Sequence, residues 1–138
     1  MIVVDANVAI KWVIDQPLRD RAREIVARRI AVVAPSMFVA ETTTALWKYV
    51  RAGQIGAQQA RQGLSLVLGQ ISVFEQDANL ADEALDIGAQ LNYAPYDCFY
   101  LSLAMQRGVP FVTVDQRFIN RIAQTVYKPH VVHLSDWT

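Results

Sequence analysis

The chain has 138 residues and a hydrophobic content of 53%, which is enough for one domain with a sizeable buried core. Its 13 basic and 13 acidic residues cancel, and this excludes a broadly basic surface for nucleic acid. No apolar stretch approaches the ~18 residues of a membrane span, and a single cysteine, Cys98, excludes an intrachain disulfide and a zinc–cysteine cluster. We therefore expect a cytoplasmic protein without a targeting or membrane segment.

Short apolar runs alternate with longer helical patterns along the chain, which predicts an α/β fold with a parallel sheet. The expected strands cover residues 2–4, 31–34, 71–74, 111–114 and 130–133. Their uninterrupted apolar character is typical of strands that helices cover on both faces.

Helices are expected in the intervals between these strands. In chain order they run from a cap at Asn7 to about Ile14, from Pro17 to about Arg29, over 36–51, over 57–68, over 78–91 with Asp77 as cap, over 96–107, and from Asp115 to about Ala123. The aromatic residues within and beside these helices, Tyr93 and Tyr96 among them, are expected in the core or in a subunit interface and not as platforms for base stacking.

Four acidic residues stand where the surrounding pattern is apolar or uncharged: Asp5, Glu41, Asp97 and Asp115. Two of them end apolar runs, and the other two lie in the otherwise uncharged stretches 35–47 and 96–105. A buried carboxylate without a positive partner is costly. Since no basic residue is placed near them in sequence, the pattern favours a divalent metal ion as their shared counter-charge.

Asp5 and Asp115 each follow an expected strand and precede an expected helix. Ligands of open parallel sheets bind beyond the carboxyl ends of strands, at the point where strand order reverses. The two strands are therefore candidate neighbours across such a crevice. The alternative explanation is that each aspartate simply caps the helix that follows it.

Glu41 has only uncharged neighbours one helical turn away, and Lys48 lies ~10.5 Å along the axis, so a local salt bridge is not expected. The helix macrodipole offers an alternative explanation for Glu41 and also for Asp97 in the first turn of its helix. Asp82 and Asp86 differ, because they lie opposite the apolar positions of their helix and indicate a solvated face.

A site made of carboxylates, without cysteine or a convincing histidine ligand, suits Mg²⁺ or Mn²⁺. Such ions keep open positions for water and for substrate phosphates, and they lower the pKa of a bound water. The predicted chemistry is hydrolysis of a phosphodiester bond without a side-chain nucleophile.

Four short segments resemble the motifs of the PIN domain, and specifically those of VapC-type toxins from prokaryotic toxin–antitoxin pairs. They are residues 2–8 (IVVDANV), 40–42 (AET), 96–104 (YDCFYLSLA) and 112–117 (VTVDQR). The resemblance covers essentially the whole chain. It implies a single PIN-like nuclease domain over residues 1–138, built as a three-layer α/β/α sandwich with a central five-stranded parallel sheet.

The same resemblance implies a Mg²⁺-dependent endoribonuclease, in which the metal is held by an acidic quartet of Asp5, Glu41, Asp97 and Asp115. Asn7 and Thr113 match polar positions of the family that orient these carboxylates or contact metal-bound waters. Some members carry a further acid where this chain has Phe118 and Ile119. One firmly held metal is therefore expected, with a second arriving with RNA.

The resemblance also implies a homodimer that a VapB-type antitoxin neutralises, and an antitoxin arginine inserted among the acids would suit their charge. Single-stranded or looped RNA is the expected substrate, with tRNA and rRNA both open. The acidic stretch 75–97 contains no basic residue, so a local basic rim around an acidic pocket is compatible with zero net charge. The candidate phosphate contacts are Lys48, Arg107, Arg117 and Arg121.

Three other functions stay open at this point. A phosphotransfer switch or phosphatase also places acids at strand ends, but Asn7 stands where a haloacid-dehalogenase-like phosphatase needs Asp, and no lysine occurs between Lys48 and Lys128. A non-catalytic module that binds RNA or a protein partner would keep the same fold. A flap-type DNA nuclease would need further acids and an insertion.

Overall fold

Five parallel strands form the centre of the computed structural model, which describes residues 1–138. They are β1 (Ile2–Val4), β2 (Val32–Pro35), β3 (Ile71–Glu75), β4 (Phe111–Thr113) and β5 (Val131–His133). Their order across the sheet is β3-β2-β1-β4-β5. The strand order therefore reverses between β1 and β4, where Val3 pairs with Phe111.

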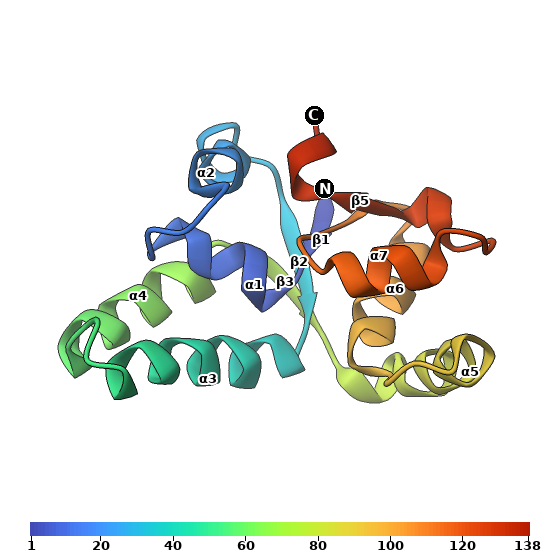
Figure 1. The fold of residues 1–138 in the computed structure, drawn as a ribbon, viewed down its shortest axis with the longest axis horizontal. Coiled ribbons are helices and arrows are strands. Elements are labelled where there is room, and N and C mark those ends of the chain that lie inside the picture. The colour runs from blue at the N-terminus through green and yellow to red at the C-terminus, as the bar shows by residue number, and fades with distance from the viewer.

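Helices cover both faces of this sheet (Figure 1). One face carries α1 (Ala6–Ala9), α2 (Arg19–Ala27), α3 (Met37–Arg51) and α4 (Ala57–Gly69), and the other carries α5 (Ala81–Leu91), α6 (Tyr96–Arg107) and α7 (Gln116–Ile122). The three-layer α/β/α sandwich with a five-stranded parallel sheet is thus confirmed. No helix combines the length and the apolar character needed to cross a membrane.

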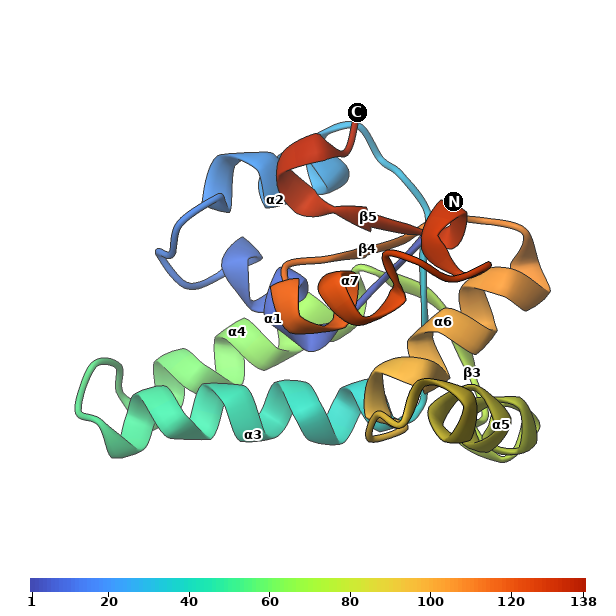
Figure 2. The same ribbon diagram turned by 45° about the vertical axis from the view of Figure 1, so that its right-hand side comes forward.

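The two longest helices of the first face, α3 and α4, lie side by side in both views (Figure 2). A 3-10 turn, Ile10–Trp12, extends α1 and packs against α2 and α3. This layer brings the start of α3 close to the start of α1. The arrangement matters for the site, because α1 begins where β1 ends.

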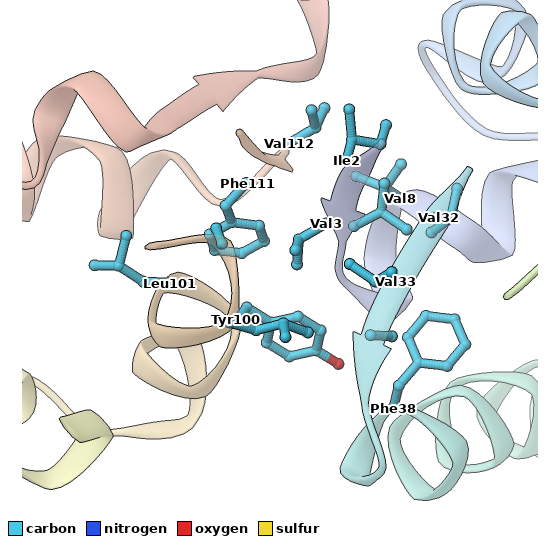
Figure 3. Close-up of a cluster of buried hydrophobic side chains, with 14 of the residues drawn as sticks. Ile2, Val3, Val8, Val32, Val33, Phe38, Tyr100, Leu101, Phe111 and Val112 are labelled. Atoms are coloured by element: carbon cyan, nitrogen blue, oxygen red, sulfur yellow. The ribbon is translucent and has the colours of Figure 1, made fainter. Parts of the chain in front are cut away.

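The core lies on both faces of the central strands, as their uninterrupted apolar runs predict. Val3, Val33 and Phe111 are fully buried. Tyr100 reaches these strands from α6 and Phe38 from α3 (Figure 3). The Tyr100 ring stacks on Phe111 with 5.5 Å between centroids, which ties α6 to the strand that leads into the site.

Several helix starts differ from the sequence-based expectation, and hydrogen bonds explain two of them. Asp5, not Asn7, caps α1, because its Oδ1 accepts a 3.0 Å bond from the Val8 amide. Asp77 does not cap a helix over 78–91. It opens a 3-10 turn, Asp77–Asn79, and its carboxylate accepts a 3.0 Å bond from the Met37 amide at the start of α3.

Other boundaries move by a few residues. The second helix begins at Arg19 instead of near Pro17, because Leu18 has a positive φ of 67° that interrupts the helical backbone. The first helix is shorter than expected, since α1 ends at Ala9 and the 3-10 turn ends at Trp12. The strands and α6 match the expected ranges to within one residue.

The stacking of α6 on β4 gives a direct stability prediction. Phe111→Ala should lower the free energy of unfolding by about 3–5 kcal/mol, because it removes a fully buried ring between α6 and α7. Urea unfolding followed by circular dichroism would measure this. Leu85→Ala is the control: its side chain is 67% exposed, and its expected change is within about 0.5 kcal/mol. Equal effects of the two substitutions would contradict this description of the core.

Candidate functional site

The four carboxylates singled out by the sequence approach one another at the carboxyl edge of the sheet. Asp5 follows β1 and Asp115 follows β4, so these two lie at the reversal of strand order. Glu41 comes from the second turn of α3 and Asp97 from the first turn of α6. Burial is the largest cause that raises the pKa of Asp97, and the charges of the other three acids add to the rise. All four acids therefore lie within electrostatic reach of one another.

Asp5 is the most constrained member of the quartet. Its side chain is only 3% exposed, and its two oxygens accept hydrogen bonds from the Val8 amide and, at 2.6 Å, from the Thr113 hydroxyl. Burial raises its pKa to about 6, while these bonds act in the opposite direction and the nearby Asp115 adds to the rise. Asp5 is therefore both the cap of α1 and a fixed carboxylate at the sheet edge.

Thr113 joins the two aspartates that follow the strands. Its buried hydroxyl donates to Asp5 Oδ2 and accepts a 3.1 Å bond from the Asp115 amide. The Asp115 carboxylate in turn caps α7 by accepting a 3.1 Å bond from the Phe118 amide. The expected role of Thr113 as an orienting residue thus has a geometric basis, and both aspartates cap helices while they face the same crevice.

Glu41 is held from the opposite side of the sheet by α6. The Tyr100 hydroxyl donates a 2.9 Å hydrogen bond to Glu41 Oε2, and the Tyr100 side chain is only 1% exposed. Burial raises the pKa of Glu41, the bond from Tyr100 counteracts the rise, and the charges of Asp5 and Asp77 add to it. The macrodipole alone does not account for a carboxylate positioned in this way.

Asp97 has the most strongly perturbed pKa of the quartet. Burial, the charge of Asp115, a hydrogen bond between the Asp97 and Asp115 side chains, and the charges of Asp5 and Glu41 together raise its pKa to about 8. Burial and the surrounding negative charges therefore favour the protonated form of Asp97. Asp97 is largely protonated at neutral pH in the metal-free protein.

The quartet fits a hard divalent cation by its chemistry, although it is not already spaced as a ligand set. No group of three or more histidine, cysteine, aspartate or glutamate side chains stands at metal-ligand spacing. All donors at the site are carboxylate oxygens, and Asp5, Glu41 and Asp97 have raised pKa values that a dication would lower. Metal binding would require loss of the proton of Asp97 and rearrangement of the Asp97–Asp115 contact.

Lys11 corrects the expectation that no basic residue lies near the acids. Its side chain is 7% exposed, its Nζ donates a 3.1 Å bond to Gln16 Oε1, and its charge interacts with that of Asp5. Burial lowers the pKa of Lys11, and Asp5 partly restores it. One buried positive charge therefore lies near Asp5. The site as a whole still carries more negative than positive charge.

A hollow of about 510 Å³ borders the quartet on the side of α1 and α3. Glu41 lines it, together with the exposed side chains of Asn7, Lys48 and Tyr96. Asn7 is thus at the rim of the site, while its backbone amide contributes to lowering the pKa of Asp5. Tyr96 is 69% exposed, which excludes the core for this residue and leaves a subunit interface as the untested part of the expectation.

A second hollow, of about 430 Å³, lies on the side of α7 and is lined by Tyr93, Arg117, Asn120 and Arg121. The Arg121 guanidinium stands 5.9 Å from the centroid of the Tyr93 ring. Burial is the largest cause that raises the pKa of Tyr93, and the charges of Asp115 and Asp97 add to the rise. The charges of Arg117 and Arg121 act in the opposite direction. The two arginines therefore lie next to the quartet and are in no salt bridge.

Arg107 is placed differently from the other candidate phosphate contacts. It lies at the last turn of α6, ten residues after Asp97 and hence ~15 Å along the helix axis. Its guanidinium forms a 3.6 Å salt bridge with Glu75. Phe118, at a position where some relatives carry an acid, is fully buried in the core.

The PIN domain family model matches residues 2–123. The chain belongs to the PIN domain family. Among solved structures, the crystal structure of PAE2754 from Pyrobaculum aerophilum is similar, with a TM-score of 0.74 and 22% sequence identity over 97% of this chain and 83% of that chain. This likeness supports the fold. A comparison with curated proteins gives no significant match. PIN domains are generally nucleases.

The raised pKa values predict how the stability of the metal-free PIN domain depends on pH. In the folded protein the pKa of Asp5 is about 6 and that of Asp97 is about 8, both above their ordinary values. The stability gained from protonating these acids is therefore complete below their ordinary pKa values, and it is lost as the pH rises through about 6 and about 8. The melting temperature in EDTA should therefore fall by roughly 5 °C between about pH 5 and about pH 8.

Added Mg²⁺ should reverse this loss, and its effect should be larger at the higher pH, where the carboxylates are ionised. Thermal unfolding with EDTA and with MgCl₂ at both pH values would test the two expectations. The Asp86→Asn variant, altered on an exposed face of α5, should reproduce the wild-type profile. A melting temperature that rises with pH in EDTA would contradict the assigned protonation states.

Proposed function

We propose that this PIN domain is a Mg²⁺- or Mn²⁺-dependent endoribonuclease, and that it is the toxin of a VapC-type toxin–antitoxin pair. The observation that carries the proposal is that four carboxylates lie within electrostatic reach of one another near the reversal of strand order. Two of them follow β1 and β4, and the other two come from the second turn of α3 and the first turn of α6. The match to a family of nucleases supports the reaction class. The acidic, non-nucleophilic donor set supports hydrolysis over covalent catalysis.

The quartet would hold the cation, and hydrogen bonds support three of its four acids. Asp5 is fixed by Val8 and Thr113, Glu41 by Tyr100, and Asp115 by its cap on α7. When bound, the cation would supply charge stabilisation at the phosphoryl oxygens and a lower pKa for an attacking water. Asp97, whose pKa is raised to about 8 in the metal-free protein, would have to lose its proton to bind the cation.

The basic residues at the rim would orient the RNA backbone. Arg117 and Arg121 line the hollow next to Asp115, and Lys48 lines the hollow next to Glu41, so phosphates on both sides of a cleaved bond have a cationic partner. Arg107 is the least supported contact, because Glu75 already pairs with it.

The toxin assignment rests on the motif resemblance and brings its partners with it. We propose a cytoplasmic homodimer, with the site regulated by a VapB-type antitoxin. An arginine of such an antitoxin could neutralise the quartet, because Asp5, Glu41 and Asp97 all have pKa values raised by burial that an adjacent guanidinium would lower.

Asp5→Asn should lower RNA cleavage by about a hundredfold or more, because an amide cannot supply the negative charge that the cation needs. Asparagine caps helices as well as aspartate does, so the fold should persist. The assay is cleavage of total RNA by purified, antitoxin-free protein with Mg²⁺ or Mn²⁺ and, separately, with EDTA.

Asp86→Asn serves as the matched control, since Asp86 lies on the exposed face of α5 and should leave cleavage unchanged. Discrete fragments that require both the metal and Asp5 would support the endoribonuclease and reveal the target from the fragment ends. Equal cleavage by wild type and Asp5→Asn would overturn the proposed site. Metal binding without any cleavage would favour a binding module in its place.

A further inference from the structure

The hollow beside Glu41 has the size and lining of a site for a flat ring. Its volume is about 510 Å³, and helices α1, α3 and α6 form its walls. Tyr96 stands on one side, 69% exposed, at the first position of α6 and directly before Asp97. An aromatic ring in this position contributes little to the core, so packing does not account for it.

Small side chains form the remaining apolar lining. Ala6 from α1 and Ala40 and Ala45 from α3 present only methyl groups to the hollow. No longer apolar side chain lines it, so a planar group can approach both helices and lie against the Tyr96 ring. Base–aromatic stacking needs such a surface and tolerates any base, because every base has a π-face.

Polar groups surround this apolar lining. Asn7 and Thr44 line the hollow with exposed side chains, which provide an amide and a hydroxyl for the edge of a base. Lys48 also lines it, is exposed and is in no salt bridge, so its ammonium group is available for a backbone phosphate.

Charge favours a base over a phosphate as the occupant. The Glu41 carboxylate lines the hollow and would repel an anion beside it, so Lys48 is the one group of the hollow that suits a phosphate. The hollow on the α7 side has the opposite character, because Arg117 and Arg121 line it without a carboxylate. The backbone of a bound strand therefore fits the arginine side, and an uncharged base fits the tyrosine side.

We propose that the hollow between α1, α3 and the start of α6 is a nucleobase subsite, in which Tyr96 stacks on a base adjacent to the cleaved phosphate of a single-stranded RNA. The inference rests on the proposed nuclease function and deepens it. Since a base must leave its helical stack to enter, the subsite selects single-stranded or looped RNA over duplex RNA. Asn7 and Thr44 are the groups that would distinguish one base from another.

The test measures binding separately from cleavage. Short single-stranded RNA oligonucleotides that carry the fluorescent base 2-aminopurine would be titrated, with Mg²⁺, into protein made non-cleaving by Asp5→Asn. In this background Tyr96→Phe should retain both affinity and quenching of the 2-aminopurine signal. Tyr96→Leu should lose the quenching and weaken binding about tenfold. An oligonucleotide with an abasic residue in place of 2-aminopurine should bind Tyr96→Leu and its parent equally well.

Trp47→Leu is the matched control, since Trp47 is an exposed aromatic residue of α3 that lines a different hollow. It should leave binding and quenching unchanged. Unaltered binding and quenching by Tyr96→Leu would overturn the subsite, and so would equal losses in the Phe and Leu variants. Because the readout does not depend on catalysis, a wild-type protein that stacks bases without cutting RNA would refute the nuclease and leave the subsite standing.

Discussion

The buried carboxylate of Asp5 is the constraint on which the site depends. It ends β1, caps α1 and receives the Thr113 hydroxyl from β4, so three elements meet at one side chain. An isolated carboxylate is costly to bury, and here two hydrogen bonds and the charge of the buried Lys11 offset part of that cost. Burial and the charges of Asp115, Asp5 and Glu41 raise the pKa of Asp97 to about 8. A divalent cation would offset the negative charge that these acids bring together.

Three of these acids also take part in hydrogen bonds that organise the fold. Asp5 and Asp115 cap helices at adjacent strands, while the stacking of Tyr100 on Phe111 holds α6 against β4 and directs the tyrosine hydroxyl to Glu41. The rim is then divided by charge. Arginines of α7 line one side, and alanines, a tyrosine and polar groups of α1, α3 and α6 line the other.

Local patterns in the sequence are sufficient for the strands, for α6 and for the positions of Asp5 and Asp115 after adjacent strands, since apolar runs and capping residues act over a few positions. Contacts between residues that are distant in the sequence cannot be predicted from such local patterns. The bond between Asp77 and the start of α3 spans forty residues, and Tyr100 gives no sign in sequence of its bond to Glu41. Lys11 was overlooked although it is the lone charge of an apolar stretch, the same signal that identified Glu41. The exposure of Tyr96 is likewise not predictable from its residue type, which is equally compatible with a core position and with a subunit interface.

Direct measurement of Mn²⁺ binding tests the central claim, that the four carboxylates form one cation site. Electron paramagnetic resonance would follow free Mn²⁺ during titration of the purified protein and of four variants, each with one acid of the quartet changed to its amide. The account predicts that the wild type binds Mn²⁺ and that each of the four changes weakens binding by about tenfold or more, with Asp86→Asn unaffected. Wild-type affinity in the Asp5→Asn and Asp97→Asn variants would contradict it.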